Sequence, residues 1–137
     1  MKRAAEIPRQ VLLSALNDQD AQLLHTWRQD PAVVDGTLGY PFPTSLEAER
    51  DWIRSFMPRG TPTDLCFGIR GSIDGPLQGY AQLRGIDWLA RCAEFGVVIG
   101  NPDARGWGLG KATVQAMVGY AFGNLRLQRL WLRVASF

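Results

Sequence analysis

A glycine-rich stretch is the part of this chain whose residue types and spacing are best suited to binding a charged ligand. Residues 101–111 read NPDARGWGLGK, with glycine at positions 106, 108 and 110. The strand-like run Phe95–Ile99 precedes them, and a helical pattern follows from Leu109 to Leu125. Glycines let a backbone approach a ligand closely, and the first N–H groups of a helix have no partners within it. The sequence therefore predicts a phosphate-binding loop between a strand and a helix.

Lys111 favours the same interpretation on electrostatic grounds. It falls in the first turn of the expected helix, where the helix dipole disfavours a cation. An anion bound at that turn would remove the conflict. The alternative is that the glycines only form a tight turn.

The loop differs from two common nucleotide-binding motifs. A P-loop requires glycine at position 105 and a serine or threonine after the lysine, whereas this chain has Arg105 and Ala112. Neither glycine frame completes G-x-G-x-x-G, because Lys111 and Thr113 stand where the third glycine is needed. The acidic residue that would bind a ribose about 20 residues later is also missing. What remains is the pattern R-x-x-G-x-G, formed by Arg105, Gly108 and Gly110.

This pattern, in this setting, resembles the pyrophosphate loop of the GNAT superfamily, the acyl-CoA-dependent N-acyltransferases. The glycines alone are weakly specific, but an ordered set of further segments resembles one bacterial branch, which includes ribosomal-protein N-terminal and spermidine acetyltransferases. These segments cover nearly the whole chain: Leu23–Pro31, Ile86–Trp88 with Arg91, Ala93–Gly96, Ile99–Gly100, Tyr120–Phe122, Leu125, Leu127 and Arg129. The resemblance implies an α/β fold with a mixed, mostly antiparallel central sheet flanked by helices.

The resemblance also implies which residues hold the co-substrate, acetyl-CoA. In GNAT enzymes the strand before the loop binds the pantetheine arm through its backbone, and a bulge splays that strand from the next one, so that the arm lies in the gap. The matching strand residues here are Val97, Val98 and Ile99. The pyrophosphate would lie against Arg105, Gly106, Trp107, Gly108, Leu109, Gly110 and Lys111. A backbone amide near Val98 would stabilise the oxyanion of the thioester carbonyl.

The implied reaction is direct attack of a neutral amine on the acetyl thioester, with no metal and no covalent intermediate. A base must then remove a proton from the ammonium form of the substrate. Glu94 is the candidate, because family members often place a carboxylate on this strand near the acetyl group. The alternative is that Glu94 is a solvated strand residue. His25, the only histidine, could titrate near neutral pH, although a surface or packing role on the first helix is favoured.

Aromatic residues provide further candidates for contact with the amine acceptor. Tyr40, in a loop that reads GYPFP, could line an acceptor pocket. Trp52 and Trp88 are interpreted as packing residues, with acceptor contact as the alternative. Tyr80 is interpreted as a residue on a face of the sheet.

Two features depart from the family pattern. Trp107 stands where the loop is often basic or small, which could alter contacts with the adenosine end. After Val134 the family normally continues with an asparagine, a helix carrying a tyrosine that protonates the leaving thiolate, and another strand. Because the sequence ends at Phe137, we expect a C-terminally shortened fold. It would be a truncated form, a fold completed by another chain, or a protein that has lost turnover.

The same feature predicts self-association. Leu130, Leu132 and Val134 alternate with polar or aromatic neighbours, so Leu130–Val134 reads as a last strand with one buried face. Without later segments it becomes a sheet edge with unpaired backbone groups, which is a template for another chain. We therefore expect a homodimer or higher oligomer through Arg129–Phe137.

Composition limits the other functional classes. The 137 residues suit a single domain spanning 1–137, with 46% hydrophobic and 20% charged residues. A net charge of +2 gives little support for nucleic-acid binding, and no apolar run approaches membrane-spanning length. Cys66 and Cys92 match no metal spacing and read as buried free thiols. With no leader visible at the N-terminus, these thiols predict a cytoplasmic protein.

Periodicity and capping signals predict the elements that position these residues. Asn17 or Asp18 is expected to cap the first helix, Pro31 to end it, and Thr44 with Glu47 to form the capping box of the second. Asp74 and Gly75 mark a hairpin. The expected strands are Val11–Leu16, Leu65–Arg70, Leu77–Arg84, Arg91–Ile99 and Leu130–Val134. The expected helices are 17–28, 44–57 and 109–125, with a loop at 33–43. The buried face of the third helix is expected to contain Val114, Met117, Val118, Ala121, Phe122 and Leu125.

Two functions remain. The first is an acetyl-CoA-dependent N-acetyltransferase, whose acceptor is a primary amine on a small molecule or peptide, such as a protein N-terminus, a polyamine, an amino sugar or a drug. The second is a non-catalytic acyl-CoA-binding or interaction module on the same fold. A mononucleotide-binding protein is excluded by the loop sequence. Acceptor loops vary on a shared scaffold, so the sequence does not identify the acceptor.

Overall fold

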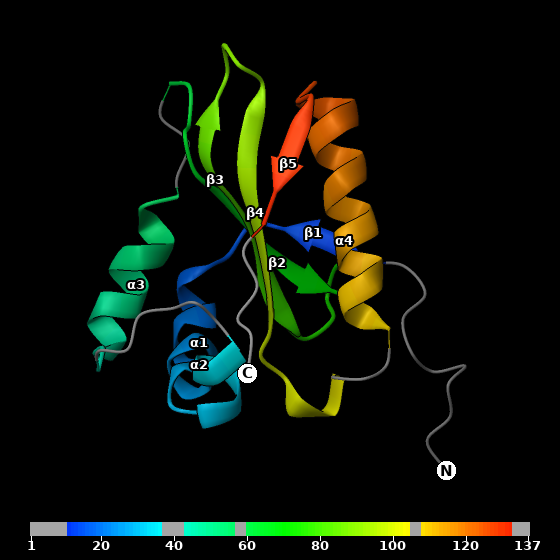
Figure 1. Cartoon of the computed structure of the whole chain (residues 1–137). Coiled ribbons are helices and arrows are strands. Elements are labelled where there is room, and N and C mark those ends of the chain that lie inside the picture. The colour runs from blue at the N-terminus through cyan, green and yellow to red at the C-terminus, as the bar shows by residue number, and fades with distance from the viewer. Residues whose placement is uncertain (1–10, 37–42, 57–59, 105–107, 133–137) are drawn as a thin grey trace.

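The chain folds around one central sheet with helices on both of its faces (Figure 1). The computed structural model describes residues 11–36, 43–56, 60–104 and 108–132. Within these residues the sheet has five strands in the order β1-β2-β3-β4-β5. They are β1 (Leu12–Ser14), β2 (Leu65–Arg70), β3 (Gly79–Asp87), β4 (Cys92–Ile99) and β5 (Arg129–Trp131). The first four strands pair antiparallel and β5 joins β4 in parallel, which confirms the mixed, mostly antiparallel sheet.

The helices divide between the two faces of the sheet. A 3₁₀ turn, η2 (Asp18–Asp20), leads into α1 (Ala21–Arg28), and α1, α2 (Pro31–Gly36) and α3 (Leu46–Arg54) lie together on one side (Figure 1). On the other side is α4 (Leu109–Gly119), which continues as a π-helical turn, η4 (Tyr120–Asn124). A short 3₁₀ turn, η3 (Pro102–Ala104), connects β4 to the segment before α4.

Each face of the sheet has its own hydrophobic core. The core beneath α4 consists of Ile69, Ala81, Leu83, Ile86, Ala93, Phe95, Ala104, Leu109, Met117, Ala121 and Leu127. The core beneath α1 and α3 consists of Ala21, Leu24, Trp27, Val33, Ile53 and Leu77. Because neighbours along a strand point to opposite faces, β4 contributes to both: Val97 packs against the first core and Val98 against the second.

Two helix boundaries differ from expectation. The first helix ends at Arg28, and Pro31 begins α2 instead of closing a helix, so residues 33–36 are helical and not loop. Proline is well suited to the first position of a helix, where its missing N–H would have no partner. Helix α3, which the sequence predicted as the second helix, is capped by Ser45, whose Oγ accepts the amide N–H of Ala48 at 3.0 Å. The expected cap at Thr44 is wrong.

The buried face of α4 also differs from expectation. It contains Leu109, Thr113 and Met117, and continues to Ala121, whereas Val114 and Phe122 are exposed. Thr113 can be buried because its hydroxyl donates to the carbonyl oxygen of Leu109 at 2.8 Å. The buried face of α4 therefore includes Thr113, a polar residue that the apolar periodicity did not predict to be buried.

The turn between β3 and β4 explains the segment 86–91, which reads IDWLAR. Asp87 Oδ1 accepts the amide N–H groups of Leu89 and Ala90 at 3.0 and 2.8 Å. The carbonyl oxygen of Arg91, a residue with φ of 59°, accepts from Gln128 at 2.7 Å, at the start of the β5 segment. This part of the family-like sequence therefore shapes the hairpin and ties it to β5.

The pairing of β3 with β4 is continuous along the strand that precedes the glycine loop. Gly79 to Arg84 face Ile99 to Glu94 without a break. The register shifts between Arg84 and Asp87, where Gly85 adopts a φ of +56°.

Helix α1 contacts the end of β4 through Trp27. A Cβ added to Gly100 would lie 1.9 Å from a carbon of the Trp27 indole, so only glycine allows this contact. Trp27 lies on α1 and Gly100 follows β4 directly. The contact therefore fixes α1 against the strand that leads to the glycine loop.

Strand β5 lies at an edge of the sheet, as expected. Its described part is Arg129–Trp131, and residues 133–137 lie outside the described residues. Trp131 and Leu132 are 48% and 52% exposed. Association of this edge with a second copy stays a prediction.

The same change, glycine to alanine, made at two different positions tests the role of Gly100. Gly100→Ala should lower the free energy of unfolding by about 1–3 kcal/mol, because the new methyl group overpacks against Trp27. Gly119→Ala, at a helical position with nothing within 4 Å of the added Cβ, should raise it by about 0.5–1 kcal/mol. Urea unfolding of both variants measures the difference, and equal effects would contradict the close Trp27 contact.

Candidate functional site

The beginning of α4 presents backbone donors at the end of the glycine loop. Gly108 is the N-cap, with a φ of +80° that favours glycine. The first bond of the helix runs from the Ala112 amide to the Gly108 carbonyl at 3.0 Å. The amides of Leu109, Gly110 and Lys111 precede that bond and have no acceptor within the helix. These N–H groups, together with the helix dipole, form a binding site for an anion.

The side chains around these amides differ in character. Leu109 is buried in the core beneath α4, so it offers a ligand only its backbone. Lys111 is exposed, and a Cβ added to Gly110 meets nothing within 4 Å. Arg105, Gly106 and Trp107, the other predicted loop residues, lie outside the described residues.

Strand β4 brings the remaining predicted cofactor residues to the same end of the sheet. Val97, Val98 and Ile99 are each half-buried, and Val98 lies opposite Tyr80 of β3. The described ladder between β4 and β5 covers only the beginning of β4, from Cys92 to Glu94. The predicted cofactor residues thus lie beyond the point where the two strands pair.

Glu94 is a buried carboxylate, and its interpretation as a solvated strand residue is wrong. It is 7% exposed and pairs with Arg84, whose Nη2 lies 3.3 Å from Glu94 Oε2. Arg84 also donates from Nη1 to Gln82 Oε1 at 3.3 Å. Glu94 and Arg84 lie on the same face of the sheet as Val98, the face covered by α1 and α3.

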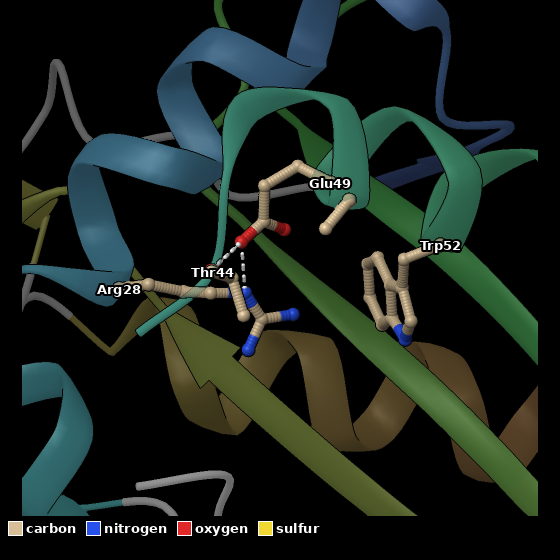
Figure 2. A pocket seen from close by; sticks show the side chains of 5 residues that line it. Arg28, Thr44, Glu49 and Trp52 are labelled. Atoms are coloured by element: carbon tan, nitrogen blue, oxygen red, sulfur yellow. Dashed lines mark hydrogen bonds and ion pairs between the residues drawn. The ribbon is translucent and has the colours of Figure 1, made fainter. Parts of the chain in front are cut away.

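A pocket of about 270 Å³ opens between α1 and α3 on this face of the sheet. Figure 2 shows the side chains that line it converging from the two helices and the segment before α3. The lining residues are Arg28, Thr44, Ala48, Glu49 and Trp52.

Glu49 is the most buried group in the pocket wall, with 1% of its side chain exposed. Its Oε1 accepts the hydroxyl of Thr44 at 2.9 Å and forms an ion pair with Nε of Arg28, while Oε2 has no hydrogen-bond partner. The Arg28 contact is close but poorly aligned, so it acts as an ion pair more than as a hydrogen bond. Burial alone would lower the pKa of Arg28, but its interactions with Glu49, Tyr80 and Cys66 together outweigh burial and raise the pKa.

Two buried groups that interact electrostatically with Arg28 stay protonated. Burial raises the pKa of Tyr80, and it raises the pKa of the Cys66 thiol strongly, although the positive charge of Arg28 opposes both shifts. A thiol with a raised pKa is a poor nucleophile at neutral pH. This agrees with the interpretation of Cys66 as a structural free thiol.

The remaining sequence candidates lie elsewhere. Trp88 donates from Nε1 to the carbonyl oxygen of Pro62 at 2.7 Å, which is a packing role. His25 is half-buried on α1, with its Nε2 3.0 Å from Nε2 of Gln29. Tyr40 lies outside the described residues.

Sequence reasoning did not identify Arg28 and Glu49 as site residues. A signal for Glu49 was present: it follows Leu46 by three positions and precedes Ile53 by four, so it lies on the inward stripe of α3. A carboxylate in that stripe needs a buried partner.

One family description matches nearly the whole chain. A family model described as "Acetyltransferase (GNAT) domain" matches residues 10–137. The chain belongs to this family of acetyltransferases. The glycine loop, the strand before it and the helix after it are thus parts of a GNAT domain.

Solved GNAT structures share the fold at low sequence identity. Spermidine N-acetyltransferase from Vibrio cholerae, in complex with CoA and spermine, aligns with a TM-score of 0.79 at 22% identity, covering 92% of this chain and 72% of that one. A chimera of the Vibrio cholerae enzyme SpeG and hSSAT gives a TM-score of 0.75 at 21% identity, with coverages of 90% and 69%. A complex of the Vibrio cholerae enzyme with manganese ions gives 0.69 at 20% identity, with coverages of 92% and 69%. No curated protein matches the chain.

The described residues of this GNAT domain include neither a metal-binding cluster nor a membrane-spanning helix. They contain no group of three or more histidine, cysteine, aspartate or glutamate side chains placed to hold a metal ion. No helix among them is both long and apolar enough to span a membrane.

Proposed function

We propose that this GNAT domain transfers the acetyl group of acetyl-CoA to a primary amine. The observation that carries the proposal is the start of α4, where three amides without helical acceptors follow the left-handed Gly108 at the end of the glycine loop. This arrangement suits the pyrophosphate of a CoA molecule. The family match supports acyl transfer as the reaction.

The cofactor would lie along β4 and end at α4. Arg105, Gly106, Trp107, Gly108, Leu109, Gly110 and Lys111 would hold the pyrophosphate, the last three with backbone N–H groups. Val97, Val98 and Ile99 would hold the pantetheine arm beyond the paired part of β4 and β5. A backbone amide near Val98 would donate to the oxyanion.

The chemical step is a direct aminolysis of the thioester. The neutral amine forms a bond from its nitrogen to the carbonyl carbon, giving a tetrahedral oxyanion. Collapse of that intermediate breaks the carbon–sulfur bond, and the CoA thiolate leaves and takes up a proton. The amide product loses the proton that the attacking nitrogen carried.

Glu94 is the proposed base that prepares the amine. It lies on β4, on the face that also carries Val98 and the pocket, and it is shielded from bulk water. Arg84 holds the carboxylate in place through the contact at 3.3 Å. A carboxylate in that position would take a proton from an ammonium group entering from the pocket side.

The structural neighbours support an amine as the acceptor. One of them is named as a spermidine N-acetyltransferase bound to CoA and spermine. At 22% identity this likeness shows the fold, and it does not identify which amine this chain would acetylate.

A carboxylate placed at Gly110 tests the cofactor site. Gly110→Asp should reduce CoA affinity by about a hundredfold or more, because the new charge repels the pyrophosphate. The helix itself should keep its stability, since an acidic residue suits the first turn and a Cβ there meets nothing within 4 Å. Calorimetric titration with CoA measures the affinity.

The matched control is Gly119→Asp, in the same helix and equally open. It adds the same charge far from the first turn and should leave CoA affinity nearly unchanged. Unaltered CoA binding in the Gly110 variant would contradict the assignment of the start of α4.

Substitution of Glu94 tests the base. Glu94→Gln should lower turnover at neutral pH by about a hundredfold or more while CoA affinity stays nearly constant. The rate should recover partly at higher pH, because more of the amine is then already neutral. Glu47→Gln removes an exposed carboxylate of α3 and serves as the control. A pH–rate profile identical to that of the wild type would exclude Glu94 as the base.

A further inference from the structure

We propose that the pocket between α1 and α3 binds the carboxylate of an acceptor that is also an amine, an acceptor of the amino-acid class, with Arg28 as its partner. The inference rests on the function proposed above and deepens it by naming the chemical class of the acceptor. It concerns the pocket lined by Arg28, Thr44, Ala48, Glu49 and Trp52.

The guanidinium of Arg28 has donors available to a ligand. Its contact with Glu49 uses Nε, and Figure 2 shows the two terminal nitrogens on the far side of the guanidinium from the carboxylate. Within the described ranges of the chain, no hydrogen bond or ion pair engages those two nitrogens. The side chain is 27% exposed, so a ligand in the pocket can reach it.

The orientation of this guanidinium is fixed before any ligand arrives. Glu49 holds it on one edge, and its Cζ lies 5.2 Å from the centroid of the Trp52 ring. Thr44 in turn holds the carboxylate of Glu49 at 2.9 Å. A planar fork held in this way matches the two oxygens of a carboxylate, and little side-chain freedom remains to be lost on binding.

The charges of the pocket favour an acid over a polyamine. Glu49 is the only carboxylate among the five lining residues, and it is already paired with Arg28 and Thr44 through Oε1. Its unpartnered Oε2 is enclosed and out of reach of solvent. A second cation would therefore meet the guanidinium of Arg28 without an accessible counter-charge. A carboxylate would instead complete a row of alternating charges from Glu49 through Arg28 to the ligand.

The pocket lies one side chain away from the strand proposed to carry the thioester. The Trp52 and Tyr80 rings meet edge to face with centroids 5.3 Å apart, and Tyr80 lies opposite Val98 of β4. A carboxylate on Arg28 would leave the rest of a small acceptor extending past Trp52 toward β4. The volume of about 270 Å³ is slightly below the usual range for pockets that bind drug-sized ligands, which suits a molecule of amino-acid size.

Pairs of amines that differ only in a carboxylate test the proposal. The protein is saturated with CoA, and L-lysine and cadaverine, then L-ornithine and putrescine, are titrated by calorimetry. The amino acid of each pair should bind about 10- to 100-fold more tightly than its decarboxylated counterpart, as expected for charge-assisted hydrogen bonds. Initial rates of acetyl transfer to the same compounds are measured in parallel.

Two variants separate recognition from folding. Arg28→Gln with Glu49→Gln removes both charges of the pair, so no buried charge is left alone, and it should abolish the preference for the amino acid. Arg50→Gln removes an α3 guanidinium that pairs with Glu47 outside the pocket, and it should keep the preference. Circular dichroism and CoA affinity confirm that both variants are folded.

Every outcome decides one of the two proposals. Equal binding within the pairs, tighter binding of the diamines, or a preference that survives in the folded double variant would overturn the carboxylate pocket. Acetyl transfer to any amine would still support the proposed function in those cases. If the folded, CoA-bound protein acetylates no amine, the proposed function fails, and the calorimetric preference alone then decides the pocket.

Discussion

The carboxylate of Glu49 imposes the main constraint on one half of this molecule. A buried charge without a partner is strongly unfavourable, and removing one member of a buried ion pair typically costs about 3–5 kcal/mol. Glu49 comes from α3 and Arg28 from the last turn of α1, so the pair can form only when the two helices lie side by side. The stacking of Arg28 on Trp52 and the bond from Thr44 then fix the walls of the pocket. One electrostatic requirement thus sets the spacing of the helices and the shape of the cavity between them.

Strand β4 connects this pocket to the proposed cofactor site. Its side chains alternate between the two cores, so the same strand packs against α4 with Val97 and against the α1 and α3 side with Val98. It leaves the sheet at Gly100, where Trp27 packs, and leads through η3 toward the first turn of α4. The amides at that turn and the proposed acceptor pocket are therefore held on the two sides of one strand. An acyl transfer between two substrates requires an arrangement of this kind.

The sequence predicted the regular parts of the fold because their signals are local. Alternation located β2 with its observed bounds, and the glycines located the start of α4 at Leu109. The errors occur where a local signal had two solutions. Thr44 and Ser45 are both good caps, and the burial of Glu49, which Thr44 satisfies, decides between them. Pro31 ends a helix in one context and begins one in another, and the packing of Val33 selects the second.

The candidate site was predictable only where it depends on the backbone. The glycines and the helix start would bind the cofactor through N–H groups, so their positions along the chain are enough to identify them. Arg28, Glu49 and Tyr80 are brought together by packing between segments far apart in the sequence, and a single sequence does not record such contacts. Glu94 is intermediate, since its strand was predicted but its pairing with Arg84 depends on the register of β3 and β4.

The most direct measurement is release of the CoA thiol from acetyl-CoA, followed together with the mass of each member of a panel of amines. The account predicts that thiol appears only when an amine is present, and that one acetylated amine forms for each thiol released. Tight binding of CoA without thiol release for any amine would contradict it, and would assign the chain to a non-catalytic acyl-CoA-binding module.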